Sequence, residues 1–275
     1  MDDLAAMARL VDALRPWRNQ LVVVGGWAHR LHCYHPWASA PAYEPLLTKD
    51  ADLAFSLDAA PTGDIRSALL AAEFREVLSG DHRPPIAEYR LGEEHAGFFA
   101  EFLAPLKGGG ETRRGIEDAT VERAGVTAQK LRHLDLLLIA PMAVRLDANG
   151  GVPLKRPADV LLANPVSFIA QKLLIRKSRK PEKQAQDALY VHDTIELFAS
   201  TLDELNALWH QGVRPTLRRK MIKEVDRLRE EQFGRVDDVI RQAARIPVGR
   251  TLTPERMQAT CAPGLEEIFG VSRQT

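Results

Sequence analysis

The chain of 275 residues is 45% hydrophobic, which is enough for a substantial core in one large domain or two modest ones. Its 37 basic and 37 acidic residues cancel, so the overall charge selects no class of partner, and a nucleic-acid surface would have to be a local patch. No apolar run approaches the length of a membrane span, and the acidic N-terminus lacks the basic segment of a signal peptide. Together with only two cysteines, far apart in the sequence, these features predict a cytoplasmic protein with no disulfide framework and no membrane partner.

Helical and strand patterns alternate through the first part of the chain. Apolar residues recur at helical spacing over residues 3–15, and Pro16 ends this helix. Residues 166–245 show long helical patterns and high charge instead. The expected fold class is therefore α+β, with a mixed-sheet domain over residues 1–160 and a helical domain over residues 161–275. Within the first domain we expect further helices from residue 28 and at 67–74, and strands at 21–24, 51–57, 86–91, 98–104, 131–139 and 142–146.

The strand at residues 21–24 runs directly into Gly25 and Gly26, and a helix follows. Glycine at such a junction permits positive φ and removes side-chain bulk, so backbone N–H groups can approach an anion at the helix N-terminus. By itself the glycine pair fits an ordinary turn as well as a phosphate site.

Three acidic residues stand in or beside predicted strands. Asp50 and Asp52 face the same side of the chain, and their carboxylates could share a hard cation such as Mg²⁺, which prefers oxygen ligands. Glu101 is a lone acid within an apolar strand and is the best candidate for a third ligand of a two-metal site. The competing interpretation is a solvent-exposed start of the strand for the two aspartates, and an edge strand that exposes Glu101.

A second group of potential metal ligands lies in the helix that follows the glycines. His29 and His32 are three residues apart, with Cys33 and His35 beside them, a spacing that could serve zinc. No later Cys or His pair completes such a site in the sequence. We therefore expect a structural helix in which one histidine touches substrate and Cys33 packs as a small apolar residue.

The order of Gly-Gly, Asp-x-Asp and a later strand acid resembles the nucleotidyltransferase superfamily with the DNA polymerase β-like fold. Within that superfamily it resembles most the bacterial AbiEii-type, MNT-like and MenT-like proteins. Glycine stands where many of these relatives carry serine in the first motif, and a long insert with proline and aromatic residues separates the two motifs. The matching motifs are Gly25-Gly26-Trp27-Ala28 and Thr48-Lys49-Asp50-Ala51-Asp52-Leu53.

The same families carry a later helical lysine and an aspartate in a Lys/Asp/Tyr-rich helix. Within residues 165–198, Lys172 matches the lysine and Asp187 the aspartate, with Asp193 as a competing match. The resemblance implies transfer of an NMP from an NTP by a nucleotidyltransferase-type mixed sheet flanked by helices and followed by a helical domain. The implied catalytic residues are Asp50, Asp52, Glu101, Lys172 and Asp187. The implied Mg²⁺ ligands are Asp50, Asp52 and Glu101, and the implied nucleotide-binding residues are Gly25, Gly26, Arg30, Lys49 and Lys172.

The acceptor implied by the resemblance is a hydroxyl or phosphate group, of tRNA or of a protein if the chain is toxin-like, and an antitoxin partner would then accompany it. A dense basic cluster suits a phosphate-rich partner such as tRNA, although such clusters are most often solvated helix faces. Two alternatives stay open: a transferase acting on a small compound such as an aminoglycoside, and a nucleotide-binding or interaction protein without turnover. The basic cluster consists of Arg176, Lys177, Arg179, Lys180 and Lys183.

Overall fold

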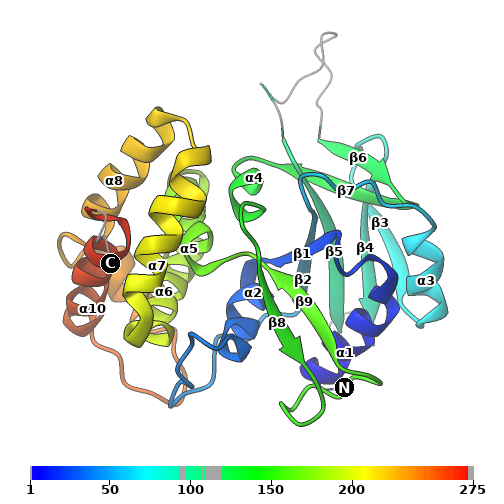
Figure 1. Cartoon of the computed structure of the whole chain (residues 1–275), viewed down its shortest axis with the longest axis horizontal. Helices are drawn as coiled ribbons and strands as arrows, with labels where there is room; N and C mark the ends of the chain where they lie inside the picture. Colours follow the sequence, from blue (N-terminus) through cyan, green and yellow to red (C-terminus); the bar gives the residue numbers. More distant parts are fainter. Residues whose placement is uncertain (1, 93–96, 107, 109–118, 272–275) are drawn as a thin grey trace. The chain divides into compact units, whose positions relative to one another are not determined.

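The computed structural model describes residues 2–92, 97–106, 108 and 119–271 (Figure 1). The chain folds into two compact units. The first comprises Met1–Tyr34 and Leu47–Ala163, and the second comprises His35–Leu46 and Asn164–Thr275. The segment that joins the Gly-Gly motif to the Asp-x-Asp motif therefore packs with the C-terminal helices, although both motifs belong to the first unit.

The first unit is built on one mixed sheet, in which the described residues form nine strands. These are β1 (Leu21–Val24), β2 (Asp50–Phe55), β3 (Arg75–Ser79), β4 (Ile86–Leu91), β5 (Phe98–Pro105), β6 (Thr120–Arg123), β7 (Val126–Leu131), β8 (Met142–Leu146) and β9 (Ala158–Leu162). The strand order is β3-β4-β5-β2-β1-β9-β8, and β7 pairs with both β5 and β6. Central β2 is antiparallel to β1 and parallel to β5, and the start of β5 pairs with β4.

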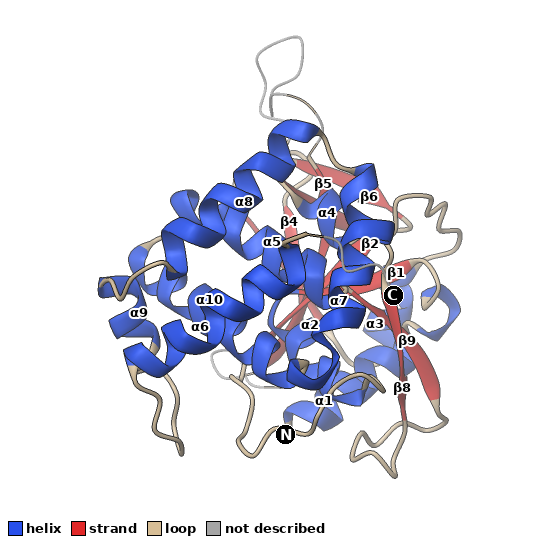
Figure 2. Cartoon of the chain, turned by 60° about the vertical axis from the view of Figure 1, so that its left-hand side comes forward, coloured by secondary structure: helices blue, strands red, loops and turns tan. Residues whose placement is uncertain are grey.

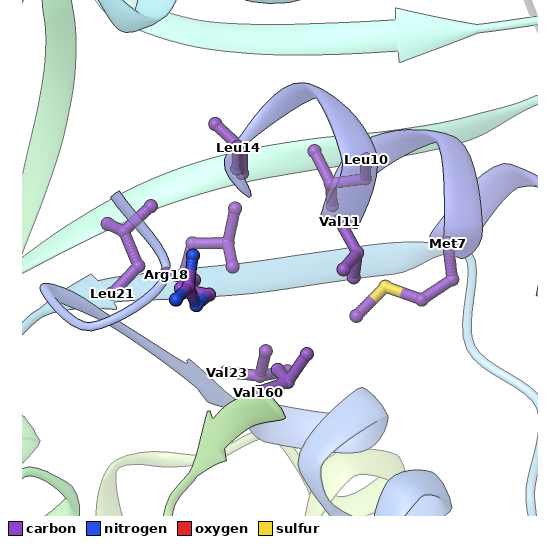
Figure 3. Close-up of a pocket in the computed structure, with 9 residues that line it drawn as sticks. Met7, Leu10, Val11, Leu14, Arg18, Leu21, Val23 and Val160 are labelled. Carbon is purple, nitrogen blue, oxygen red and sulfur yellow. The ribbon is translucent and has the colours of Figure 1, made fainter. Parts of the chain in front are cut away.

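One face of this sheet is apolar and lies under helix α1 (Asp3–Ala13). Side chains of α1 and of β1, β2 and β9 surround a small apolar pocket, with Arg18 among its lining residues (Figure 3). Leu53 on β2 lines this pocket. Because side chains alternate along a strand, the preceding residue, Asp52, faces the opposite side of the sheet. The sheet therefore has an apolar face under α1 and a second face on which acidic side chains stand.

The remaining helices of the first unit are α2 (Gly25–Leu31), α3 (Ile65–Ala71) and α4 (Leu134–Leu137). Helix α4 corrects the strand that the sequence predicted at residues 131–139. Strand β7 ends at Leu131, His133 adopts the left-handed conformation with a φ of 59°, and α4 follows with Leu134 and Leu137 buried. A continuous apolar run fits a buried helix as well as a buried strand, so its pattern does not separate the two. Strand β3 was also missed, because it has no buried residue to create a pattern.

The second unit is helical, and its described residues contain no strand (Figure 2). Its helices are α5 (Pro165–Ile175), α6 (Pro181–Leu197), α7 (Leu202–Ala207), α8 (Arg219–Phe233), α9 (Asp238–Ala243) and α10 (Pro254–Phe269). Asn164 begins α5 by accepting a hydrogen bond from the Ser167 N–H at 2.8 Å, and Pro165 occupies the first helical position, where no N–H is needed. Helix α10 packs against α6, α7 and α8.

The prediction of an α+β fold is confirmed, because a mixed sheet flanked by helices makes up the first unit and helices make up the second. Within the described ranges, no helix combines the length and the apolar character needed to cross a bilayer.

Candidate active site

The two glycines stand where β1 turns into α2. Val24 is extended, and Gly25 then takes a φ of +64°, in the left-handed region that favours glycine. A Cβ atom on Gly25 would also overlap with Asp52 Oδ2. Gly25 is therefore required both by its backbone conformation and by the close approach of Asp52.

Strand pairing brings the Asp-x-Asp motif and Glu101 to one place. Val24 is the register partner of Asp52 across the β1–β2 pair, and Asp52 is the partner of Glu101 across the parallel β2–β5 pair. Register partners on neighbouring strands project from the same face of a sheet, and so do residues i and i+2 of one strand. Asp50, Asp52 and Glu101 therefore share the face opposite α1. The hydroxyl of Thr48 donates a hydrogen bond to Asp50 Oδ1.

A fourth acid, Glu88 on β4, was missed by the sequence interpretation. It is the register partner of Glu101 across the antiparallel β4–β5 pair, and it is bound by Arg90, whose Nη2 lies 2.7 Å from Glu88 Oε2. Alternation in the strand would have placed Glu88 and Arg90 on one face, but no local signal shows that β4 lies beside β5. The acidic face is therefore wider than the motif residues indicate.

The neighbouring acidic residues change the pKa of Glu101. Burial raises the pKa of Glu101 to about 7, and the charges of Glu88 and Asp50 add to the rise. Either a proton or a cation would compensate this carboxylate. An all-oxygen donor set of this kind fits a hard divalent cation such as Mg²⁺.

The three predicted ligands share a face, but their oxygen atoms do not converge on one point. Among the described residues, the group of three whose ligand atoms are close enough to hold an ion is His192, Asp193 and Glu196, within 4.8 Å of one another. A cation on the acidic face would therefore have to draw the carboxylates of Asp50, Asp52 and Glu101 together by rotation of their side chains.

The group on α6 is already neutralised by arginines. Arg250 Nη2 lies 2.5 Å from Asp193 Oδ1, and Arg250 Nη1 lies 3.3 Å from Glu196 Oε2. Arg256 Nη2 lies 3.5 Å from Glu196 Oε1, and His192 Nδ1 lies 2.9 Å from Asp193 Oδ1. These ion pairs compensate the buried Asp193 and the half-buried Glu196 without a metal ion.

Lys172 and Asp187 contact each other in the second unit. Lys172 Nζ lies 2.7 Å from Asp187 Oδ1, and both side chains are buried. Arg179 Nε donates a hydrogen bond to Asp187 Oδ2 at 3.2 Å. Of the two competing aspartates, it is thus Asp187 that pairs with Lys172, whereas Asp193 pairs with Arg250.

The other two predicted nucleotide-binding side chains have different surroundings. Arg30 stacks over the ring of Trp27, 4.7 Å from its centroid, and lies 3.7 Å from Asp3 on α1. Lys49 is exposed, and its carbonyl accepts a hydrogen bond from the Phe99 N–H, which helps to set the β2–β5 register. The contacts of Arg30 favour a packing role. The backbone hydrogen bond of Lys49 puts this residue beside the acidic face.

His29 and His32 are buried inside the first unit, whereas His35 belongs to the second. His32 Nε2 lies 2.8 Å from the Ala163 carbonyl oxygen, and the rings of His29 and His32 stand edge to face with centroids 6.4 Å apart. Cys33 Sγ donates to the carbonyl of Arg30. As far as the structure describes the chain, these residues do not form a metal-ligating group.

A family model described as nucleotidyltransferase matches residues 2–213, which include the Gly-Gly and Asp-x-Asp motifs together with Lys172 and Asp187. The chain belongs to this nucleotidyltransferase family, and the protein is accordingly an enzyme of the transferase class. No curated protein sequence matches the chain. Among solved structures, it is similar to the nucleotidyltransferase toxin MenT4 from Mycobacterium tuberculosis H37Rv, at 13% sequence identity and a TM-score of 0.38, covering 98% of this chain and 83% of that chain.

Proposed function

We propose that the protein transfers an NMP from an NTP to an acceptor in a reaction that depends on Mg²⁺. The observation that carries the proposal is the alignment of Val24, Asp52 and Glu101 across three neighbouring strands, with Gly25 against the Asp52 carboxylate. This alignment puts the N-terminus of α2 beside the acidic face, so that an anion and its counter-cations could be bound together.

The carboxylates of Asp50, Asp52 and Glu101 would hold the cations. When bound, such ions activate an attacking oxygen and neutralise the leaving pyrophosphate. The raised pKa of Glu101 supports this role. A bound cation would stabilise the ionised carboxylate and so release its proton.

The phosphates themselves would be bound by neutral and by positive groups. The backbone N–H groups at Gly25 and Gly26 would donate to phosphate oxygens, which glycine permits by leaving the approach open. Lys172, held by Asp187, would supply a point charge to the triphosphate.

The acceptor is proposed to be an RNA such as tRNA, and the basic cluster at residues 176–183 supports this choice. Lys177, Arg179 and Lys180 are exposed, whereas Arg176 is engaged with Asp237 at 3.1 Å. Exposed cations of this density attract a polyanion in a salt-dependent way. A protein acceptor, a small hydroxylated compound and a partner antitoxin remain predictions from the sequence resemblance, as does the cytoplasmic location.

Incubation of the protein with labelled NTPs, Mg²⁺ and total tRNA tests the proposal. Label in RNA supports nucleotidyl transfer to RNA, and label in the protein itself indicates a protein acceptor. If no label transfers, and NTP with Mg²⁺ still raises the melting temperature, the chain binds nucleotide without turnover. The Asp52→Asn variant, which keeps the side-chain volume, serves as the inactive control.

A further inference from the structure

The acidic face of the first unit continues past the aspartates to two arginines and a phenylalanine. Asp50 on β2 is the register partner of Phe99 on β5, Phe99 is the partner of Arg90 on β4, and Arg90 is the partner of Arg75 on β3. Register partners on neighbouring strands project from the same face of a sheet. Phe99, Arg90 and Arg75, which we call the rim row, therefore extend the acidic face from β5 to β3.

Contacts on the opposite face agree with this placement. Tyr89 and Glu76, the chain neighbours of Arg90 and Arg75, are register partners of each other. The Tyr89 hydroxyl donates to Glu76 Oε1 at 3.0 Å, and Arg66 on α3 donates to Glu76 Oε2 at 2.8 Å. Because these side chains lie on the side of α3, alternation along the strands leaves Arg90 and Arg75 on the other side.

The rim row and the glycine motif flank the aspartates from opposite sides. The strand order β3-β4-β5-β2-β1 puts β2 between β1, which runs into Gly25, and the strands of the rim row. In an in-line displacement at phosphorus, the attacking and leaving oxygens stand on opposite sides. With the leaving pyrophosphate bound at Gly25 and Gly26, the attacking oxygen of the acceptor approaches from the side of the rim row.

Both arginines of the rim row are anchored. Arg90 Nε and Nη2 donate to Glu88 Oε2 at 2.9 and 2.7 Å, and the Arg90 side chain is 30% exposed. Arg75 is exposed, and its Nη2 donates to the Gly92 carbonyl at 2.8 Å. Like charges on register partners destabilise a sheet. Sheet stability therefore does not account for this pair of arginines, whereas an anionic ligand would.

Phe99 adds a stacking surface between the aspartates and the arginines. It is half-buried and belongs to the polar face, since Phe98 and Ala100 on either side of it in β5 are buried. Nucleobases stack on aromatic rings of this kind, and guanidinium groups bind phosphate through charge-assisted hydrogen bonds. An aromatic ring beside two arginines therefore matches both parts of a nucleotide.

We propose that the rim row is the acceptor subsite and binds the terminal nucleotide of an RNA, with the base against Phe99 and the phosphodiester at Arg90 and Arg75. Glu88 is the positioning residue that orients Arg90. The inference rests on the proposed NMP transfer and adds to it the place and the chemistry of the acceptor. A polycationic small compound would meet two cations at this subsite, which disfavours it as the acceptor.

The test compares Arg75→Gln, Arg90→Gln and Phe99→Leu with wild type. Arg145→Gln is the matched control, because Arg145 is an arginine of the same sheet, on edge strand β8, 59% exposed and paired with Asp159 at 3.2 Å. Transfer kinetics with Mg²⁺ would give the KM for total tRNA and for NTP. Equilibrium binding of total tRNA at several salt concentrations, calorimetric titration with NTP and thermal melts would accompany them.

Arg75→Gln and Arg90→Gln should each raise the KM for RNA by about tenfold and lower the salt dependence of RNA binding by about one ion, as expected for a lost phosphate contact. Phe99→Leu should weaken RNA binding by about fivefold to a hundredfold, the size of a lost base–aromatic stack, with an unchanged salt dependence. NTP affinity should stay at the wild-type value in all three. Arg145→Gln should match wild type throughout.

Arg90→Gln leaves Glu88 without this ion pair, so Arg75→Gln and Phe99→Leu decide the outcome if Arg90→Gln melts early. A wild-type KM for RNA in both overturns the inference, and so does an equal loss in Arg145→Gln. Weaker NTP binding with an unchanged KM for RNA also overturns it and assigns the rim row to the NTP. A wild type that transfers NMP to a protein or a small compound, and does not bind RNA, sinks only this inference. A wild type that neither binds NTP nor transfers NMP sinks the proposed function as well.

Discussion

The carboxylate of Asp52 fills the space that a side chain on Gly25 would need. Two motifs that lie apart in the sequence, Gly-Gly and Asp-x-Asp, are thus in direct contact through the β1–β2 pair. The contact joins the start of α2 to an acidic strand, and the proposed binding of a metal-complexed polyphosphate rests on this combination.

Replacement of Gly25 by alanine should lower both stability and nucleotidyl transfer. The left-handed backbone costs a non-glycine residue about 1–2 kcal/mol, and the new methyl group would displace Asp52. Gly151→Ala is the matched control, because Gly151 also has a positive φ, of +87°, but has nothing within 4 Å of an added Cβ. Chemical denaturation and transfer assays should show lost stability in both variants and lost transfer in Gly25→Ala alone.

Replacement of Asp52 by asparagine should strongly lower the rate of transfer while preserving the fold. The change removes one charge from the proposed metal site, and loss of a dominant electrostatic contribution typically lowers a rate by about a hundredfold to a thousandfold. Wild type should gain melting temperature from Mg²⁺ plus NTP, and Asp52→Asn should gain less. Transfer at the wild-type rate, or equal stabilisation of both proteins by Mg²⁺ plus NTP, would contradict the metal-binding role.

Part of the acidic face could be predicted from local sequence patterns. The Gly25–Gly26 break and the alternation at Asp50 and Asp52 are visible within a few residues, and Glu101 is visible as a charge in an apolar strand. The neighbourhood of Glu88 and Glu101 depends instead on which strands pair, and pairing between distant segments leaves no local trace.

In the helical unit, too, some features follow from local sequence and others depend on long-range packing. Its helices follow from periodicity, but the anchoring of Arg179 on Asp187 depends on how the end of α5 and the start of α6 are packed. The assignment of residues 35–46 to the second unit likewise depends on long-range contacts, among them the hydrogen bond from the Ser39 N–H to the Leu197 carbonyl at 2.8 Å.

The pKa of Glu101 predicts a pH-dependent stability in the metal-free protein. In the folded protein Glu101 keeps its proton up to a pKa of about 7, whereas the unfolded chain releases it near the ordinary value of 4.5. The folded state therefore binds more protons between these values, so stability should fall as pH rises from about 4.5 to about 7 and then level off. Glu101→Gln should remove this dependence.

Thermal melts of wild type and Glu101→Gln across pH 5 to pH 8 in a chelating buffer would check this prediction. The difference in melting temperature between the two proteins is compared, because the contributions of other titrating groups then cancel. The variant should be the more stable protein at pH 8, and added Mg²⁺ should reduce its advantage by stabilising wild type. A constant difference across the pH range would show that Glu101 titrates normally.

Arg250 is predicted to be essential for stability, because it compensates a buried acid. Asp193 is 2% exposed and lies 2.5 Å from Arg250, which also stacks over Tyr43 at 3.5 Å from the ring centroid. Removing one partner of a buried ion pair leaves the other charge uncompensated, at a cost of about 3–5 kcal/mol. Arg250→Leu should therefore shift the urea midpoint strongly toward lower concentration.

Arg256→Gln is the control for this prediction, because the Arg256 side chain is 66% exposed and its contact with Glu196 is long, at 3.5 Å. An exposed pair of this kind contributes at most about 1 kcal/mol, so this variant should unfold near wild type. The double variant Arg250→Leu with Asp193→Leu removes both charges and should recover part of the lost stability, since no unpaired carboxylate then remains. Equal midpoints for Arg250→Leu and Arg256→Gln would mean that His192 and the surrounding groups suffice to hold Asp193, and that Arg250 is dispensable for the fold.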